Sequence, residues 1–227
     1  MRAVGHGRGL RLQGDRGLRL RRQHLRAGVV RGSAAMNLPA RVGLQLPEWV
    51  QSVVERDRTY TSDADKVALA IALAARNIAE ATGGPFGAVV FGPDDRVVAA
   101  GVNVVLPQST SLAHAETMAY MLAQQSLGRA RINVDDQDRP CGPYTLATSA
   151  QPCCQCYGAT IWAGVDRLLI GARSDDVHEL TEFDEGPLPE DWPGELARRG
   201  IEVVRDIARD QARDVLARYG SDGGQRY

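Results

Sequence analysis

Two short motifs constrain this chain more than any other feature of its sequence. They are His114-Ala115-Glu116 and Pro152-Cys153-Cys154-Gln155-Cys156. If the second motif opens a helix, Cys153 and Cys156 lie three residues apart on one helix face. The partial positive charge of a helix N-terminus also favours the thiolate form that binds metals. A fold that brings His114 to these two thiols supplies three ligands for a tetrahedral zinc ion and leaves the fourth position for water.

Glu116 adds a group that can carry a proton beside this predicted metal site. H-x-E followed by P-C-x-x-C is the pattern of zinc-dependent nucleobase deaminases, in which the glutamate is the general acid and base rather than a ligand. Either motif alone is compatible with other roles, because a C-x-x-C pair also occurs as a redox dithiol and a lone histidine is often a core residue. Together they favour one zinc ion per chain, with Glu116 as the catalytic residue. We expect Cys154 to have a packing role, and a Cys₃His site completed by this thiol is the alternative.

Length and cysteine usage limit the class of protein. At 227 residues the chain suits one domain with a substantial core and a short appendage. No apolar run approaches the roughly 20 residues of a membrane-spanning helix, so we expect no membrane partner. Three of the four cysteines lie between positions 153 and 156, which suits a metal site in a reducing compartment better than a disulfide framework. We therefore expect a cytoplasmic protein.

Charge is distributed unevenly along the chain. Residues 1–35 contain nine arginines and one acid, although the whole chain has a formal net charge of -1. We expect this segment to be an Arg/Gly-rich disordered leader or sequence translated from a wrongly chosen start, with a nucleic-acid-binding arm or a targeting peptide as alternatives. The enzyme domain is expected over residues 36–227. Residues 174–191 contain eight acids and no Lys or Arg. We expect most of these acids to lie on a solvated surface, and the run disfavours nucleic acid as a partner.

Predicted strands and helices alternate along the domain. We expect strands at residues 86–91, 97–105, 144–149, 167–172 and 201–205. We expect helices at residues 46–55, 114–125, 153–163 and 208–219, and one more that is capped by Ser62 and Asp65 and ends before Gly83. This alternation predicts an α/β fold, a three-layer α/β/α sandwich with a mixed, mostly parallel five-stranded sheet.

From Asp65 to Asp184 the chain resembles the cytidine-deaminase-like superfamily, the CMP/dCMP type of zinc deaminases. Within it the chain is most similar to bacterial guanine deaminases and to related cytosine and nucleoside deaminases. The two zinc motifs carry most of the resemblance. The other matching residues are Gly84-Pro85-Phe86-Gly87-Ala88-Val89-Val90, Asn103, Gly158-Ala159, Trp162-Ala163 and Phe183-Asp184. The resemblance implies a five-stranded sheet between helices and a homodimer.

The resemblance also implies which residues contact the substrate. Asn103 corresponds to an asparagine that binds the purine, and Asp184 to an aspartate that accepts hydrogen bonds from ring N–H and amino groups. Phe86, Trp162 and Ala115 of the first motif are expected to complete the pocket. An amide both donates and accepts, whereas an ionised carboxylate only accepts, so Asp184 suits the N–H groups of guanine. Free cytosine also has a ring N–H, so Asp184 does not distinguish the two bases. The C-terminal tail closes the pocket in that family, which makes Tyr227 a candidate for this part.

These observations predict zinc-dependent hydrolytic deamination of a small nucleobase or nucleoside, with guanine as the leading substrate. Cytosine or another pyrimidine is the nearest alternative and shares the zinc chemistry. A tRNA adenosine deaminase has the same motifs but needs a basic face for RNA, and the chain from Met36 onward is acidic. A catalytically silent binding module that keeps zinc for stability is the non-enzymatic alternative, although it would have no use for Glu116.

Overall fold

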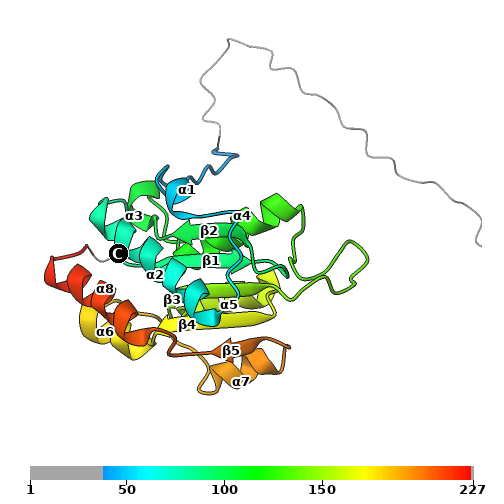
Figure 1. Ribbon diagram of the computed structural model, residues 1–227. Helices are drawn as coiled ribbons and strands as arrows, with labels where there is room; N and C mark the ends of the chain where they lie inside the picture. Colours follow the sequence, from blue (N-terminus) through cyan, green and yellow to red (C-terminus); the bar gives the residue numbers. More distant parts are fainter. Residues whose placement is uncertain (1–37, 226–227) are drawn as a thin grey trace, which may run out of the picture. The chain divides into compact units, whose positions relative to one another are not determined.

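A computed structural model describes residues 38–225 of the chain (Figure 1). The predicted leader at residues 1–35 and the terminal residue Tyr227 lie outside the described residues. The chain divides between Val42 and Gly43 into two units, and the fold described below belongs to the second unit. None of the helices in the described residues combines the length and the apolar character needed to cross a bilayer.

A mixed five-stranded sheet forms the centre of the domain. Its strands are β1 (Gly87–Phe91), β2 (Val97–Val102), β3 (Thr145–Ala150), β4 (Arg167–Ala172) and β5 (Glu202–Val204), in the spatial order β2-β1-β3-β4-β5. Strand β1 runs antiparallel to both of its neighbours, β2 and β3. The pairs β3–β4 and β4–β5 are parallel, so four of the five strands run in the same direction. The predicted mixed, mostly parallel sheet is confirmed.

Helices cover both faces of this sheet (Figure 1). They are α1 (Val50–Val53), α2 (Asp63–Ala79), α3 (Val105–Gln108), α4 (Ala115–Leu127), α5 (Cys154–Ala163), α6 (Ser174–Thr181), α7 (Trp192–Ala197) and α8 (Arg209–Ser221). Side chains on one face of the sheet pack with α2, α6 and α8, and those on the other face pack with α4, α5 and α7. Each face of the sheet thus has its own hydrophobic core. Val89 belongs to one core and Val90 to the other, because successive side chains of a strand point to opposite faces. The three-layer α/β/α sandwich is confirmed.

Local signals in the sequence explain how α2 and α4 are placed. Ser62 caps α2, because its hydroxyl accepts a hydrogen bond from the Asp65 backbone N–H at 3.0 Å and donates one to the Asp65 carboxylate at 2.7 Å. A Cβ atom at Gly101 of β2 would lie 2.1 Å from the carbonyl oxygen of Ala115. Only glycine therefore lets the first turn of α4 approach the sheet this closely, which fixes the position of the helix that carries Glu116.

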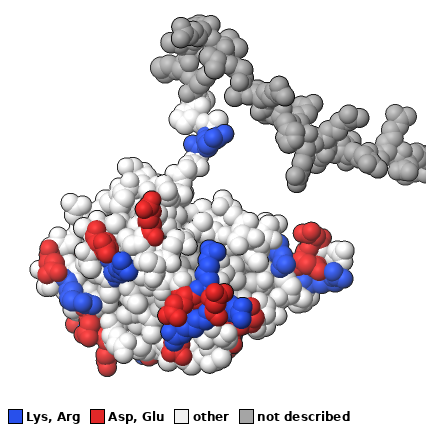
Figure 2. Space-filling model, turned by 45° about the horizontal axis from the view of Figure 1, so that its top comes forward, with Lys and Arg blue, Asp and Glu red and all other residues white. Residues whose placement is uncertain are grey.

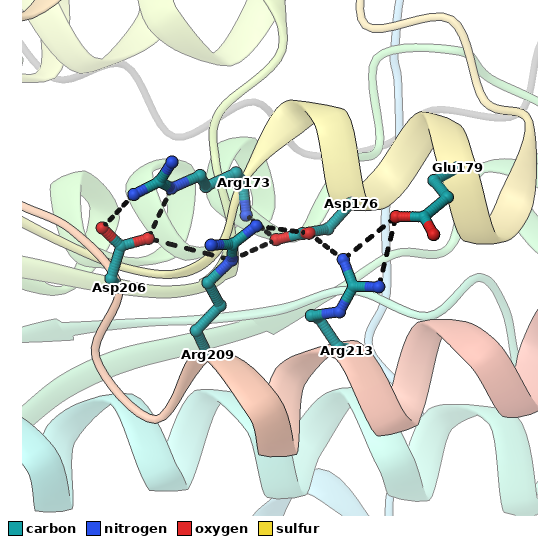
Figure 3. A network of polar contacts seen from close by, with 6 residues as sticks. All are labelled: Arg173, Asp176, Glu179, Asp206, Arg209 and Arg213. Carbon is teal, nitrogen blue, oxygen red and sulfur yellow. Dashed lines mark hydrogen bonds and ion pairs between the residues drawn. The ribbon is translucent and has the colours of Figure 1, made fainter.

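The acidic segment at residues 174–191 is more ordered than predicted. It begins with α6, whose Asp176 is only 1% exposed. Figure 3 shows that Arg209 and Arg213 of α8 both point toward the Asp176 carboxylate. Arg209 donates two hydrogen bonds of 2.7 Å, and Arg213 donates another. Most acids of this segment are exposed, as predicted, and Asp176 is the exception, because arginines that come more than thirty residues later in the chain neutralise it.

Replacing Asp176 should destabilise the domain. We expect Asp176→Asn to lower the free energy of unfolding by about 3 kcal/mol, since it removes the buried charge on which Arg209 and Arg213 converge. Glu179→Gln is the matched control, because Glu179 also pairs with Arg213 but is 64% exposed, and exposed pairs contribute less than about 1 kcal/mol. Urea unfolding at neutral pH measures both changes, and equal effects of the two substitutions would contradict the prediction.

The same carboxylate predicts how stability depends on pH. Hydrogen bonds from Arg209 hold the pKa of Asp176 well below its usual range. A carboxylate with a lowered pKa stabilises the fold above its unfolded pKa of about 3.9, and that contribution is lost as the pH falls toward the folded pKa. We therefore expect the unfolding free energy of Asp176→Asn to fall less than that of the wild type between pH 4 and pH 2.

Candidate metal centre and active site

The residues of the two zinc motifs lie at the beginnings of two helices. His114 is the N-cap residue of α4, and Glu116 lies in the first turn of that helix. Cys153 is the N-cap residue of α5, and Cys156 follows in the first turn. His114 and Cys153 both have extended backbone conformations, which differs by one residue from the predicted helix starts. Because Cys153 precedes the helix proper, it meets Cys156 across the N-terminus of α5.

The three predicted ligands converge on one point. The Nδ1 atom of His114 lies 3.5 Å from Sγ of Cys153 and 3.6 Å from Sγ of Cys156. All three ligand atoms lie within 4.8 Å of one another. A tetrahedral zinc ion with ordinary Zn–N and Zn–S bond lengths holds its nitrogen and sulfur ligands about 3.6 Å apart. The side chains are therefore already spaced as a zinc site requires.

Hydrogen bonding prepares one of the thiols for metal binding. The Cys156 thiol donates to Cys153, and this bond outweighs the effect of burial, so the pKa of Cys153 is lowered to about 4. The same bond and burial raise the pKa of Cys156. A metal must displace the remaining thiol proton, so zinc binding at this site should release protons. Cys154 is exposed and does not belong to the cluster of ligand atoms among the described residues. The alternative Cys₃His site is therefore not formed.

Glu116 occupies an unusual position for a carboxylate. It is only 6% exposed, and it lies in the same pocket as the three ligands. Burial, followed by the negative charge of Cys153, raises the pKa of Glu116 to about 7. A group whose pKa is close to the working pH is suited to take up and release protons during a reaction.

A pocket of about 290 Å³ opens in front of the ligand cluster. Its lining combines the metal ligands with polar side chains and two aromatic rings. The lining residues are Phe86, Asn103, Ser111, His114, Glu116, Gln151, Cys153, Cys154, Gln155, Phe183, Asp184, Glu185 and Gly186. The structure thus brings Phe86, Asn103 and Asp184 into the pocket, as the sequence predicts.

Two residues predicted to contact the substrate are not among those that line this pocket. Trp162 is 81% exposed. Helix α5 buries Cys156 and Thr160, and six residues beyond Cys156 the chain has turned by about 240°, which directs Trp162 away from that face. Trp162 therefore does not line the pocket of the single chain, and its contact with a substrate stays a prediction. Ala115 is fully buried and contacts β2 at Gly101.

Hydrogen bonds hold Asn103 in the wall of the pocket. The residue follows β2 and is 1% exposed. Its Oδ1 atom accepts hydrogen bonds of 3.4 Å from the backbone N–H groups of Gly84 and Val105. Its backbone carbonyl accepts a bond of 2.8 Å from the side chain of Asn77. These contacts fix the amide in one orientation beside the ligand cluster.

Sequence reasoning missed four polar residues of the pocket, namely Ser111, Gln151, Gln155 and Glu185, and two of them are held by contacts in its wall. Glu185 follows Asp184 directly, and its backbone carbonyl accepts a 2.8 Å hydrogen bond from the Cys154 N–H at the start of α5. Burial and the charges of Cys153 and Glu116 raise the pKa of Glu185 to about 8. Gln151 lies just before the second motif and is 8% exposed. The position of Gln151 directly before the second motif could have indicated that it lies near the metal site. Glu185 had no such signal, because nothing in the sequence distinguishes it from the other acids of residues 174–191.

Comparison with known proteins adds to this geometry. Residues 61–172 match the family described as the cytidine and deoxycytidylate deaminase zinc-binding region. A solved guanine deaminase from Nitrosomonas europaea is 37% identical, covers 82% of this chain and 99% of its own, and superimposes with a TM-score of 0.74. Guanine deaminase of Bacillus subtilis is 36% identical over 110 residues, which are 48% of this chain and 64% of that protein. A tRNA(Ile)-lysidine synthase of Deinococcus deserti is 33% identical over 138 residues, 58% of this chain but only 24% of that protein.

The matched region contains both motifs and all three residues of the ligand cluster. Zinc is therefore the cofactor, and the resemblance noted in the sequence is confirmed. The fold agrees over nearly the whole length of the Nitrosomonas europaea enzyme. The chain belongs to the cytidine and deoxycytidylate deaminase family of zinc-dependent hydrolytic enzymes.

Proposed function

We propose that this protein is a guanine deaminase, which converts guanine and water into xanthine and ammonia. The observation that carries the proposal is the convergence of three metal ligands and a buried carboxylate on one pocket. Two of the relatives described above are guanine deaminases, which supports the choice of base.

His114, Cys153 and Cys156 would hold the zinc ion in this proposal. Zinc, when bound, polarises water and lowers its pKa toward neutrality. The three ligands leave one coordination position, and the pocket in front of them provides room for a substrate on that side. Burial of both cysteines keeps bulk water away from the thiolates.

Glu116 moves the protons of the reaction. Its carboxylate accepts a proton from the attacking water as the new C–O bond forms at C2 of guanine, and passes it to a ring nitrogen. The carboxylate then takes the remaining proton from the added hydroxyl group and delivers it to the amine, so the C–N bond breaks, ammonia leaves and the C2 carbonyl of xanthine forms. The raised pKa of Glu116 suits both directions of transfer.

Acceptor groups and apolar surface in the pocket fit a purine base. The Asp184 carboxylate accepts hydrogen bonds from N–H groups, of which guanine offers several. Asp184 accepts one bond of 2.9 Å from the Gly186 backbone N–H, and its carboxylate has further acceptor positions for a ligand. Phe86 and Phe183 form an aromatic pair with ring centroids 5.6 Å apart, which provides a flat apolar wall.

The charges around the pocket favour a base over a nucleotide. No lysine or arginine belongs to the set of described residues that line it, whereas three carboxylates do. A phosphate group would meet repulsion there without a compensating cation. We therefore expect guanine to be turned over in preference to guanosine and GMP.

A substrate panel tests the proposal. Purified, zinc-loaded protein is assayed for ammonia release from guanine, guanosine, GMP, cytosine and cytidine under matched conditions. We expect the highest kcat/KM for guanine and the lowest for GMP. Turnover of cytosine without turnover of guanine would contradict the proposal and support the pyrimidine alternative.

Charge also disfavours tRNA as a substrate. On the face of the molecule in Figure 2, acidic and basic side chains lie next to one another and do not form one basic surface. Non-specific binding of RNA depends on such a surface and weakens steeply with salt. Salt-sensitive binding of tRNA by the purified protein would support the tRNA alternative.

We further propose that the protein forms a homodimer through the outer face of α4 and α5. Trp162 is 81% exposed, Leu112 is 60% exposed and Met121 is 36% exposed. Gln155 lies two helical turns before Trp162 on the same face of α5, and its amide bonds the Leu112 carbonyl at 3.4 Å, so the outer face of α5 adjoins the loop that carries Leu112. An exposed tryptophan among other apolar side chains is typical of an interface hot spot.

A charge at Trp162 should weaken this dimer. We expect Trp162→Arg to raise the dimer dissociation constant by about 30-fold or more, because losing a hot spot costs about 2 kcal/mol. Val42→Arg is the control, since it adds the same charge at an apolar residue that is 82% exposed and lies outside the domain. Light scattering at several concentrations gives the mass, and a monomeric wild-type protein would contradict the proposal.

We propose that the protein acts in a reducing compartment, namely the cytoplasm. All four cysteines are free thiols. Two of them must remain reduced to bind zinc in the proposed site, because only the thiolate is a metal ligand. Oxidation of Cys153 and Cys156 would therefore remove the cofactor.

A further inference from the structure

Gln151 is a buried polar residue of the pocket that the chemistry described above does not use. It follows the last residue of β3 and is 8% exposed. Its backbone N–H donates to the Ala172 carbonyl at 2.9 Å, which fixes the residue at the end of the central strands. Its side-chain amide has no hydrogen-bond partner among residues 38–225. The residue nevertheless lines the pocket.

A buried amide without a partner is costly. A polar group that loses its water and gains no hydrogen-bond partner destabilises a protein. Proteins tolerate this cost where a ligand or ordered water completes the hydrogen bonds. None of the buried side-chain atoms in the described residues is both unpaired and fully enclosed, so the amide of Gln151 keeps contact with open space. The pocket is the space that this residue borders.

Carboxyl groups are prominent among the other polar groups of the pocket. Glu116, Asp184 and Glu185 accept hydrogen bonds when ionised, whereas Asn103, Ser111 and Gln155 can also donate them. A purine such as guanine also carries acceptors, namely a carbonyl oxygen and unprotonated ring nitrogens. These atoms require donors from the protein, because unpaired acceptors lose their hydration on binding. The NH₂ group of Gln151 is such a donor.

We propose that the side-chain amide of Gln151 donates a hydrogen bond to a carbonyl oxygen or ring nitrogen of the bound heterocycle and helps to determine which base is accepted. This inference rests on the proposed function, since it names a contact made by the same substrate. The NH₂ group of the amide supplies the bond, and the amide is uncharged. A glutamate at this position would add a negative charge beside Glu116 and Glu185, where like charges repel.

Substitution of the amide combined with altered substrates tests the proposal. Gln151→Leu removes the donor at similar volume, and Gln151→Glu replaces the amide with a carboxylate of the same shape. Both are assayed on guanine, on 7-deazaguanine without the N7 acceptor, on 3-deazaguanine without N3, and on 2-aminopurine without the O6 carbonyl. We expect kcat/KM for guanine to fall by about 10- to 100-fold in both variants, the loss that corresponds to one unpaired buried group.

The decisive result is that Gln151→Leu and the wild type have equal kcat/KM on one of the analogues. On the analogue that lacks the accepted atom, Gln151→Leu and the wild type should have the same kcat/KM within about 2-fold, because the bond is absent in both. An equal loss on all four substrates would overturn the proposal, since a general disturbance of the site produces that pattern. Unchanged kcat/KM of Gln151→Leu on guanine would also overturn it.

Controls separate this inference from the proposed function. A wild-type protein that does not deaminate guanine contradicts the proposed function itself, whereas an active wild type with a fully active Gln151→Leu variant contradicts only the role of Gln151. Gln211→Leu, an exposed position on α8, should leave kcat/KM unchanged. Zinc content is measured in every variant. If Gln151→Leu does not fold, the isosteric Gln151→Glu variant is compared on the same four substrates.

Discussion

Glu116→Ala is expected to lower kcat for deamination by about three to four orders of magnitude. A positioned general acid and base contributes roughly 10²- to 10⁴-fold to a reaction of this kind, and Glu116 is expected to serve both the attacking water and the leaving amine. Zinc content and the unfolding temperature should stay near the wild-type values, because no metal ligand is removed. Steady-state kinetics and metal analysis of the purified variant check both statements.

Glu116→Gln serves as the matched variant for this prediction. It keeps the size and shape of the side chain but cannot exchange a proton, so it should be as inactive as Glu116→Ala. Near-wild-type turnover in either variant would contradict the assignment of Glu116. If the wild type and both variants bind zinc and are equally silent on every substrate, the protein is a zinc-stabilised binding module.

Cys156→Ala is expected to remove zinc and to destabilise the domain. Cys156 is fully buried, and its Sγ lies 3.6 Å from Nδ1 of His114. Loss of a direct ligand should weaken zinc binding by more than the 10- to 100-fold typical of an outer-shell partner. Bound metal stabilises a folded protein by about 4 kcal/mol when its free concentration is a thousand times the dissociation constant, and this contribution would disappear.

Cys154→Ala is the control, because Cys154 is the neighbouring thiol but is exposed and lies outside the ligand cluster. It should keep one zinc ion per chain and the wild-type unfolding temperature. Metal analysis after dialysis, together with thermal unfolding with and without a chelator, measures both variants. Full zinc occupancy in Cys156→Ala, or loss of zinc in Cys154→Ala, would mean that the ligand set is wrong.

The sequence predicted those parts of the molecule that depend on local spacing. The three-residue interval between Cys153 and Cys156 follows from helix geometry, and the structure brings both thiols to His114. The cap of α2 was visible in Ser62 and Asp65, whose side chains do bond as predicted. The alternation of strands and helices was sufficient to predict the three layers, because each layer must bury one face of the next.

Features that depend on distant parts of the chain were not predictable in this way. Asp176 looks solvated within its acidic run, and only Arg209 and Arg213 on another helix make its burial possible. Glu185 reaches the pocket because its backbone is tied to the start of α5, which no local pattern reveals. The direction of Trp162 depends on which face of α5 packs against the sheet. Similarity between sequences does not by itself reveal which face of a helix is buried.

Deamination of guanine in water enriched in oxygen-18 tests the central claim most directly. The zinc-loaded protein is incubated with guanine, and the xanthine formed is analysed by mass spectrometry while ammonia is measured in parallel. We expect one labelled oxygen atom from the solvent in each xanthine and one ammonia released for each, with neither product formed by Glu116→Ala. Absence of xanthine from a protein with a full complement of zinc, or xanthine without solvent oxygen, would contradict hydrolytic deamination at this site.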